Sequence, residues 1–235
     1  MKSITFFDLE IDPYNHHIVD IGSIKSNGET FHATSIGDFS DFLAKTEYIC
    51  GHNIFKHDLK YIRKEIPGVN KLNKIDTLYF SPLLFPAQPY HNLVKDDKLD
   101  PENYNNPLND SIKAKNLFYD EINAFKQLDE ELKQIYYLLL NGVEEFSAFF
   151  QYIDYSVEFL NVVTLIRRQF NGEVCDEADN GIQLWYLPFE EKTEPPVFKE
   201  CAKHPHINER GYVLYYTNQC PFNAKYVPIL EEIAQ

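Results

Sequence analysis

The first third of the chain carries short apolar runs separated by turn signals. Residues 4–7 are apolar and aromatic, residues 18–24 alternate apolar with small or polar side chains, and Asn27-Gly28 favours a hairpin turn. The return run at 29–34 and another at 47–50 complete four predicted strands. After Gly51-His52-Asn53 the period changes to that of a helix, with Phe55, Leu59 and Ile62 on one face.

The rest of the chain is mainly helical in pattern until its end. We expect a short broken helix at 76–85, loop at 86–107, a long helix starting near Pro107, a second capped at Asp129, and two aromatic helices within 144–170. Residues 188–210, rich in Pro, Glu and Lys, indicate a linker or surface loop. A strand at 211–217 and a helix at 223–234 follow.

Composition indicates a globular protein. The chain has 235 residues, of which 44% are hydrophobic and 25% charged, enough for one full domain with an appendage or two small domains. No long uncharged apolar run predicts a membrane span, and Asp8 interrupts any early signal-peptide core, so we expect a cytoplasmic protein. Its four cysteines form no C-x-x-C pair, which fits reduced thiols.

The charge pattern bears on the partner. A net charge of -14 argues at first against nucleic acid. Residues 56–74 nevertheless carry six Lys or Arg against two Asp or Glu, a local excess of positive charge. This stripe is either a solvated helix face or a phosphate-binding surface.

Acidic residues in three separate segments carry the candidate chemistry. Asp8 and Glu10 end the first strand, where side chains two apart point the same way. Asp58 lies near the start of the helix after Gly51, and Asp110 lies in the first turn of the long helix. Clustered carboxylates repel unless a cation neutralises them, and Mg²⁺ and Mn²⁺ prefer oxygen ligands. Taken singly, each acidic residue is also common on a surface.

In this order and on these elements, the three motifs resemble the DnaQ-like (DEDD) family of 3′–5′ exonucleases. The resemblance covers residues 1–125. Residues 89–96 and 105–118 look like the exonuclease module fused to RecQ-type helicases, and residues 145–180 look like the segment that follows that module. It implies an α/β fold: a ribonuclease H-like mixed five-stranded sheet flanked by helices, with a helical extension and a small C-terminal βα appendage. It also implies two Mg²⁺ or Mn²⁺ ions held by Asp8, Glu10, Asp58 and Asp110.

The resemblance further implies a single-stranded 3′ end of nucleic acid as substrate and a RecQ-type helicase as partner. The expected substrate-binding residues are Leu9, Asn53, Lys56, Lys60 and Lys113. The family places its general-base His, or a Tyr, where this chain has Asn105 and Asn106, and an amide cannot take a proton from water. Either the metal alone activates the water, or His91 replaces the base, or activity is weakened or lost.

The C-terminal region differs in character. Residues 184–234 resemble the end region of YoaP-like acetyltransferase proteins but contain no acetyl-CoA-binding motif, and Cys220-Pro221 resembles the start of a thioredoxin-like unit. We expect an exonuclease domain at 1–128, a helical extension at 129–182 and the appendage at 183–235. Three hypotheses follow: a metal-dependent exonuclease, a catalytically impaired nucleic-acid-binding or docking module of a repair or helicase system, and a thiol-redox or acetyltransferase-related protein.

Overall fold

The structure is a computed structural model. It describes residues 2–86, 88, 91–93, 106–158 and 160–169, together with the strands at 183–186, 206–207 and 212–215. By contacts the chain divides into two compact units, one made of Met1–Ser81, Tyr90–Gln127 and Leu140–Ser156, the other of Pro82–Pro89, Leu128–Leu139 and Val157–Gln235. The expected C-terminal helix at 223–234 and Cys220 lie outside the described residues.

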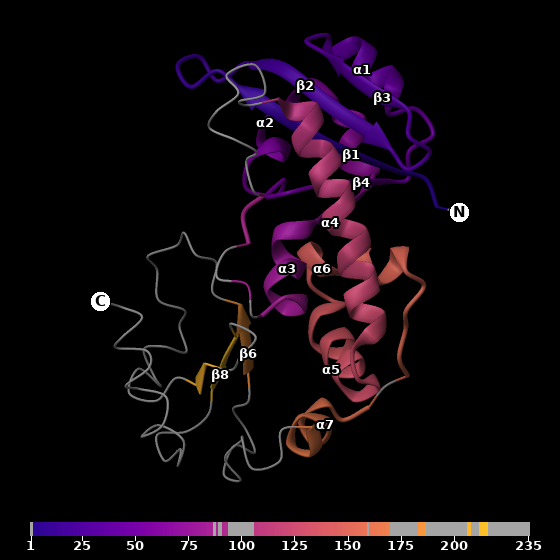
Figure 1. Cartoon of the computed structure of the whole chain (residues 1–235), viewed down its shortest axis with the longest axis vertical. Helices are drawn as coiled ribbons and strands as arrows, with labels where there is room; N and C mark the ends of the chain where they lie inside the picture. Colours follow the sequence, from indigo (N-terminus) through magenta and orange to yellow (C-terminus); the bar gives the residue numbers. More distant parts are fainter. Residues whose placement is uncertain are drawn as a thin grey trace. The chain divides into compact units, whose positions relative to one another are not determined.

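A mixed five-stranded sheet of order β3-β2-β1-β4-β5 forms the centre of the first unit (Figure 1). Its strands are β1 (Ile4–Ile11), β2 (Ile18–Lys25), β3 (Thr30–Ala33), β4 (Tyr48–Gly51) and β5 (Asn73–Asp76). The first three are antiparallel neighbours, whereas β4 and β5 run parallel to β1. The fold is therefore α/β and consistent with the ribonuclease H-like architecture that the sequence predicts.

Helices cover both faces of this sheet. On one face lie α1 (Ile36–Phe42) and α2 (Asp58–Glu65), whose Phe39 and Leu59 share a core cluster with Phe7 and Leu9. On the other, α4 (Pro107–Gln127) crosses β1 and β2, as Figure 1 shows, and Phe118 packs against Phe6 at a ring distance of 5.5 Å. Helix α6 (Glu144–Tyr152) adds Phe149 to this second layer.

The helical elements occur in the expected order. Turn η1 (Pro67–Lys71) precedes β5, and α3 (Thr77–Leu84) contains Pro82. Asp129 accepts from the amides of Glu131 and Leu132 at the start of α5 (Glu130–Leu140). The second helix expected within 144–170 is α7 (Val162–Gln169), which contains no aromatic residue. The predicted helix start at Pro107 is confirmed.

The structure differs from the sequence-based prediction at two strands. Strand β5 has the sequence Asn-Lys-Ile-Asp, and its single apolar residue gave no strand pattern. The expected loop at 188–210 contains β7 (His206–Ile207), which joins β6 (Gln183–Tyr186) and β8 (Tyr212–Tyr215) in a three-stranded sheet of order β6-β8-β7. In the part of the chain that the structure describes, no helix has the length and apolar character needed to traverse a bilayer.

Candidate functional site

The first acidic pair lies on the face of the sheet that α4 covers. Phe6 contacts Phe118 of α4, and alternate residues of a strand share a face, so Asp8 and Glu10 belong to that face. Phe7 and Leu9 point into the opposite core. The alternation that the sequence predicts for Asp8-Leu9-Glu10 is therefore present, with both carboxylates partly exposed.

Asp58 reaches β1 from the other side, at the point where β4 stops pairing with it. The β1–β4 ladder extends from Ile4 to Phe6, which leaves the later amides of β1 open on that edge. Asp58 Oδ1 accepts a hydrogen bond from the amide of Leu9 at 2.9 Å. Its carboxylate thus contacts the peptide unit that joins Asp8 to Leu9, although α2 packs on the opposite face.

Gly51 makes this geometry possible. A Cβ atom at this position would lie 2.6 Å from the carbonyl oxygen of Phe7 and 2.4 Å from Cγ2 of Ile54. Only a residue without a side chain lets the chain turn so tightly against β1. The turn that follows then leads into α2 and places Asp58 at its first position.

The start of α4 brings the third acidic segment to the same strand. Asp8 pairs in register with Gly22 of β2, and a Cβ on Gly22 would come within 1.9 Å of the Leu108 amide nitrogen. The first turn of α4 therefore rests directly on Gly22, beside Asp8. Asp110 belongs to this turn, and its carboxylate lies 3.4 Å from the Lys113 ammonium.

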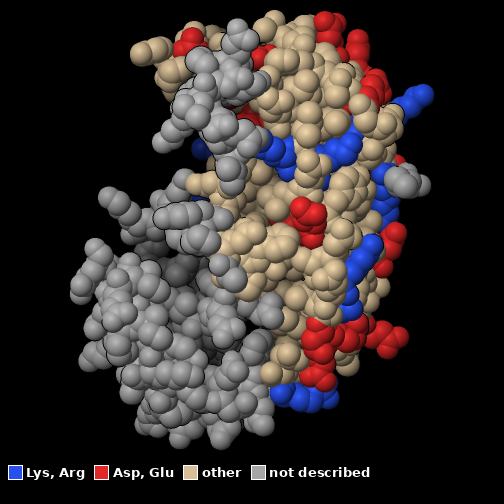
Figure 2. Space-filling model, in the orientation of Figure 1, with Lys and Arg blue, Asp and Glu red and all other residues tan. Residues whose placement is uncertain are grey.

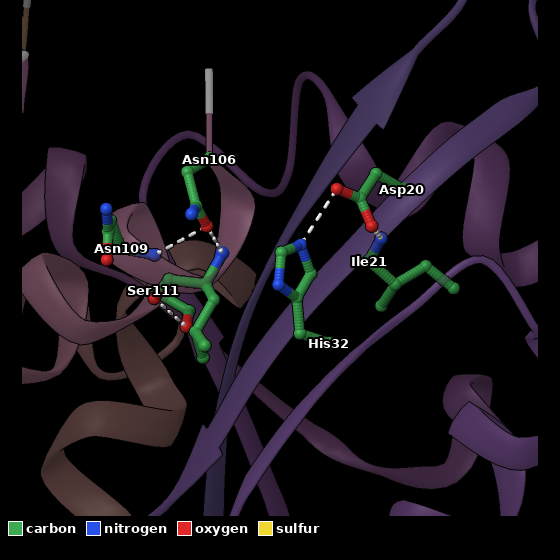
Figure 3. A network of polar contacts seen from close by, with 7 residues as sticks. Asp20, Ile21, His32, Asn106, Asn109 and Ser111 are labelled. Carbon is green, nitrogen blue, oxygen red and sulfur yellow. Dashed lines mark hydrogen bonds and ion pairs between the residues drawn. The ribbon is translucent and has the colours of Figure 1, made fainter. Parts of the chain in front are cut away.

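Asn106 anchors that turn. Its Oδ1 accepts from the amides of Leu108 at 3.0 Å and Asn109 at 3.3 Å, as the dashed lines in Figure 3 show. This is an N-cap interaction, which satisfies amides that the first helical turn leaves unpaired. The side chain of Asn106 is committed to the helix, while Asn105 lies outside the described residues.

A histidine–aspartate pair stands on the same face of the sheet. His32 Nε2 lies 2.9 Å from Asp20 Oδ2, and Figure 3 shows the two side chains turned toward each other near Asn106. His32 pairs in register with Gly22, and Asp20 pairs with Glu10. The acidic motifs gave no signal for this pair, because it depends on strand register rather than on sequence spacing.

A buried carboxyl that the sequence reading missed organises the loop between β4 and α2. Asp76, the last residue of β5, is fully buried and accepts from the amides of Asn53, Phe55 and Leu78. Burial nevertheless raises the pKa of Asp76 to about 7, and the nearby charge of Asp58 adds to the rise. Asn53 adopts a left-handed conformation with φ of 65°.

Burial also dominates the electrostatics of Asp58. Loss of solvent raises the pKa of this carboxyl, while His57 and the Leu9 amide oppose the rise. His57 Nδ1 lies 3.6 Å from Asp58 Oδ2. The side-chain contact with Asp58 raises the pKa of His57, and the charge of Glu10 contributes, which places His57 within electrostatic reach of both carboxylates.

The other predicted site residues are distributed around this edge. His91 Nδ1 lies 2.9 Å from the Ser81 hydroxyl of α3, and the charge of His91 acts on His52, which follows β4. Asn53 Oδ1 is buried without a hydrogen-bond partner among the described residues.

Some residues of the basic stripe at 56–74 already pair with other groups of the protein. Arg63 pairs with Glu144 at 3.8 Å, and Lys74 donates to the carbonyl oxygens of Asn70 and Leu72. Lys56 is partly exposed and Lys60 is exposed. Figure 2 shows basic and acidic side chains interspersed on the visible face, without a broad field of one sign.

The type of ligand favours a metal site, whereas the present spacing of the carboxylates does not. Four carboxylates suit Mg²⁺ or Mn²⁺, and the backbones that carry them converge on the end of β1. As the side chains stand, no three His, Cys, Asp or Glu residues of the described ranges gather closely enough to hold a metal ion. Metal binding by Asp8, Glu10, Asp58 and Asp110 therefore stays a prediction.

Comparison with known proteins gives limited matches. No family model matches the chain. A stretch of 60 residues is 38% identical to the uncharacterized N-acetyltransferase YoaP of Bacillus subtilis (strain 168), and it covers 26% of this chain and 24% of that protein. The chain thus spans about a quarter of the length of the curated relative it matches, and the match lies in the C-terminal region, where the sequence predicts it.

One solved structure is similar at a lower level. The family B DNA polymerase of the hyperthermophilic archaeon Pyrobaculum calidifontis shares 18% identity at a TM-score of 0.36, over 63% of this chain and 27% of that one. Similarity at this level carries no functional argument. The fold and the placement of the acidic residues therefore have to carry any proposal about function.

Proposed function

We propose that the chain is a metal-dependent 3′–5′ exonuclease that hydrolyses phosphodiester bonds of single-stranded nucleic acid. The observation that carries the proposal is the convergence of three segments at the end of β1. Asp58 contacts the Asp8–Leu9 peptide, and the first turn of α4, with Asp110, rests on the glycine paired with Asp8. The sheet order supports the same proposal.

The residues of this edge have distinct parts in the proposed reaction. Asp8, Glu10, Asp58 and Asp110 would hold two divalent cations, which when bound stabilise the charge on the attacking and leaving oxygens. Lys56, Lys60 and Lys113 would pair with substrate phosphates. Asn53, in the turn before α2, would contact the terminal nucleotide, whereas the side chain of Leu9, the other expected contact, is buried in the core on the opposite face of the sheet.

Burial sets the state of the Asp58 carboxyl in this scheme. The raised pKa of Asp58 means that a bound cation would favour its ionised form, since a nearby positive charge offsets the cost of burial. Metal binding and deprotonation of Asp58 would therefore be coupled. Metal affinity should consequently rise with pH.

A second candidate is a catalytically impaired nucleic-acid-binding module of a helicase system. Two observations favour it: Asn106 caps α4 instead of serving as a base, and the described carboxylates do not gather around one point. A RecQ-type helicase remains the proposed partner in either case, and a cytoplasmic location the expected one.

Degradation of 5′-labelled single-stranded DNA and RNA separates the two candidates. With Mg²⁺ or Mn²⁺, the full chain should shorten the labelled strand stepwise from its 3′ end. Asp8→Ala should abolish this shortening. Asp41→Ala, which changes an exposed aspartate of α1, serves as the matched control and should keep the activity. Binding without any shortening would contradict the exonuclease and support the binding module.

A further inference from the structure

An exposed aromatic surface lies beside the candidate site. Three rings contact one another: His16 from the loop between β1 and β2, and His57 and Tyr61 at the start of α2. Tyr14 lies two residues before His16 in the same loop. The His16 and Tyr61 rings are stacked, with centroids 6.5 Å apart and planes inclined by 24°. His57 meets the same Tyr61 ring edge-on at 5.8 Å.

The loop that carries Tyr14 and His16 is held in one conformation. The carboxylate of Asp12 accepts from the amides of Tyr14 and Asn15 and from the Asn15 side chain. The amide of His16 donates to the carbonyl oxygen of Asp12 at 2.9 Å. The rings are therefore presented by a closed network of hydrogen bonds rather than by a free loop.

This presentation has two costs. Tyr14 is 93% exposed, so its ring gains almost nothing from burial. His16 has a φ of 59°, a left-handed conformation that residues with a side chain adopt only at a cost. Exposed, preorganised rings of this kind do not stabilise the fold, but they can bind a flat ligand.

Two of the acidic residues lie close to these aromatic residues, Glu10 along the chain and Asp58 in space. Glu10 lies two residues before Asp12, and His57 lies 3.6 Å from the carboxylate of Asp58. The charge of Lys60 acts on His57, so a positive charge also lies beside these rings. Aromatic faces next to a lysine match a nucleic acid strand, whose bases stack while its phosphates pair with cations.

We propose that Tyr14, His16, His57 and Tyr61 form a stacking surface for the bases of a single strand whose 3′-terminal phosphodiester lies at the carboxylates. This inference rests on the proposed function for the position of the strand end. In this arrangement the loop between β1 and β2 contacts the bases of the strand where it enters the site. Stacking of this kind accepts any base, because every base has a π-face.

Binding measurements without hydrolysis test the surface. Fluorescence anisotropy with the full chain carrying Asp8→Asn, which lowers the negative charge of the site, would use a labelled oligothymidylate and an abasic oligonucleotide of equal length. The oligothymidylate should bind more tightly by about 5- to 150-fold, the range of one stacked base. Equal affinity for the two probes, or no binding of either, would overturn the inference.

Substitutions on the same background assign the effect to these rings. Tyr14→Ala should lose most of the preference and Tyr14→Phe should keep it, since stacking needs the ring and not the hydroxyl. His16→Gly removes the second ring while favouring the left-handed backbone, so the loop itself is retained. Tyr137→Ala, a partly exposed tyrosine of α5, is the matched control. An undiminished preference in Tyr14→Ala and His16→Gly would overturn the proposal.

The two proposals fail separately. A chain that prefers the base-containing strand through Tyr14 and His16 but never shortens it supports the stacking surface and contradicts the exonuclease. A chain that shortens the strand yet binds base-containing and abasic probes equally overturns the stacking surface and leaves the exonuclease supported.

Discussion

The carboxylate of Asp58 accepts a hydrogen bond from the Leu9 amide at 2.9 Å, although the two residues come from different elements and are 49 positions apart. The amide belongs to the stretch of β1 that β4 no longer pairs. Asp58 therefore completes the sheet edge as well as supplying a candidate metal ligand. The two roles call for different properties of the same side chain, an acceptor atom and a negative charge.

Two substitutions at Asp58 separate these roles. Asp58→Asn keeps an oxygen for the Leu9 amide, whereas Asp58→Ala leaves a buried donor unpaired at a cost of about 1–3 kcal/mol. Asp58→Ala should therefore be less stable than Asp58→Asn by about that amount in urea denaturation, while both lose Mn²⁺-induced stabilisation. Equal free energies of unfolding would show that the hydrogen bond contributes nothing.

A methyl group at Gly22 should disrupt the approach of α4 to β1. The Cβ of Gly22→Ala would lie 1.9 Å from the Leu108 nitrogen, so the helix must shift away from Asp8. Overpacking of this kind costs about 1–3 kcal/mol, and the displaced Asp110 should weaken Mn²⁺ binding as well. Denaturation and a metal titration monitored by calorimetry would measure the two effects.

Gly37→Ala provides the control for Gly22→Ala. Its Cβ would meet nothing within 4 Å, and it lies inside α1, where Ala is favoured over Gly by about 1 kcal/mol. This variant should be neutral or slightly more stable and bind Mn²⁺ as before. If Gly22→Ala behaves like Gly37→Ala, the close packing of α4 on β2 is not needed at this position.

The acidic motifs were readable from the sequence because each depends on a local period. Asp8 and Glu10 share a face through the two-residue repeat of a strand, and Asp110 lies in a helical turn that Pro107 begins. Their convergence was expected only through the resemblance. It depends on close approaches at Gly22 and Gly51, which no spacing along the chain encodes.

Asp76 could not be found in the same way. Its amide partners at Asn53 and Phe55 are 23 and 21 residues earlier in the chain, and β5 carries no alternating pattern. For the same reason, the sequence pattern predicted that the helix after Gly51 would begin before its true start. Asp76 holds the intervening residues in a turn, so α2 begins only at Asp58.

Glu121 should make stability depend on pH. It is fully buried on α4, and both carboxylate oxygens have no hydrogen-bond partner among the described residues. Burial raises the pKa of Glu121 well above its ordinary value of 4.5, and the charges of Asp76 and Asp120 add to this. The proton on Glu121 therefore stabilises the folded state at acidic pH, and this stability is lost as pH rises above 4.5 toward the folded pKa.

Glu121→Leu should remove this loss. Replacing a poorly satisfied buried acid by an apolar side chain is neutral or stabilising by about 1–4 kcal/mol, and the gain should be larger at pH 8 than at pH 5. The raised pKa of Asp76 adds a pH dependence of its own to both proteins. The pKa of Cys50 is raised by burial and also by the charge of Glu121, so its contribution changes in Glu121→Leu. Asp120→Asn, at an exposed neighbour, should change stability by less than about 0.5 kcal/mol. A constant difference between wild type and Glu121→Leu across this range would contradict the prediction.

The missing general base leads to the last prediction. If Asn105 occupies the histidine position of the exonuclease family, Asn105→His should raise the rate of hydrolysis, by less than the 10²–10⁴-fold that general-base catalysis typically contributes, because the inserted ring lacks supporting contacts. Asn106→His is the matched control: it removes the cap of α4, costs about 0.5–2 kcal/mol and should not raise the rate.

The pH–rate profile gives the second measurement, since Asn105→His should acquire an inflection near the histidine pKa of about 6.5 that the wild type lacks. His91 is held against Ser81, so His91→Ala should leave the wild-type profile intact. A wild-type inflection that disappears in His91→Ala, together with the activity, would instead identify His91 as the base.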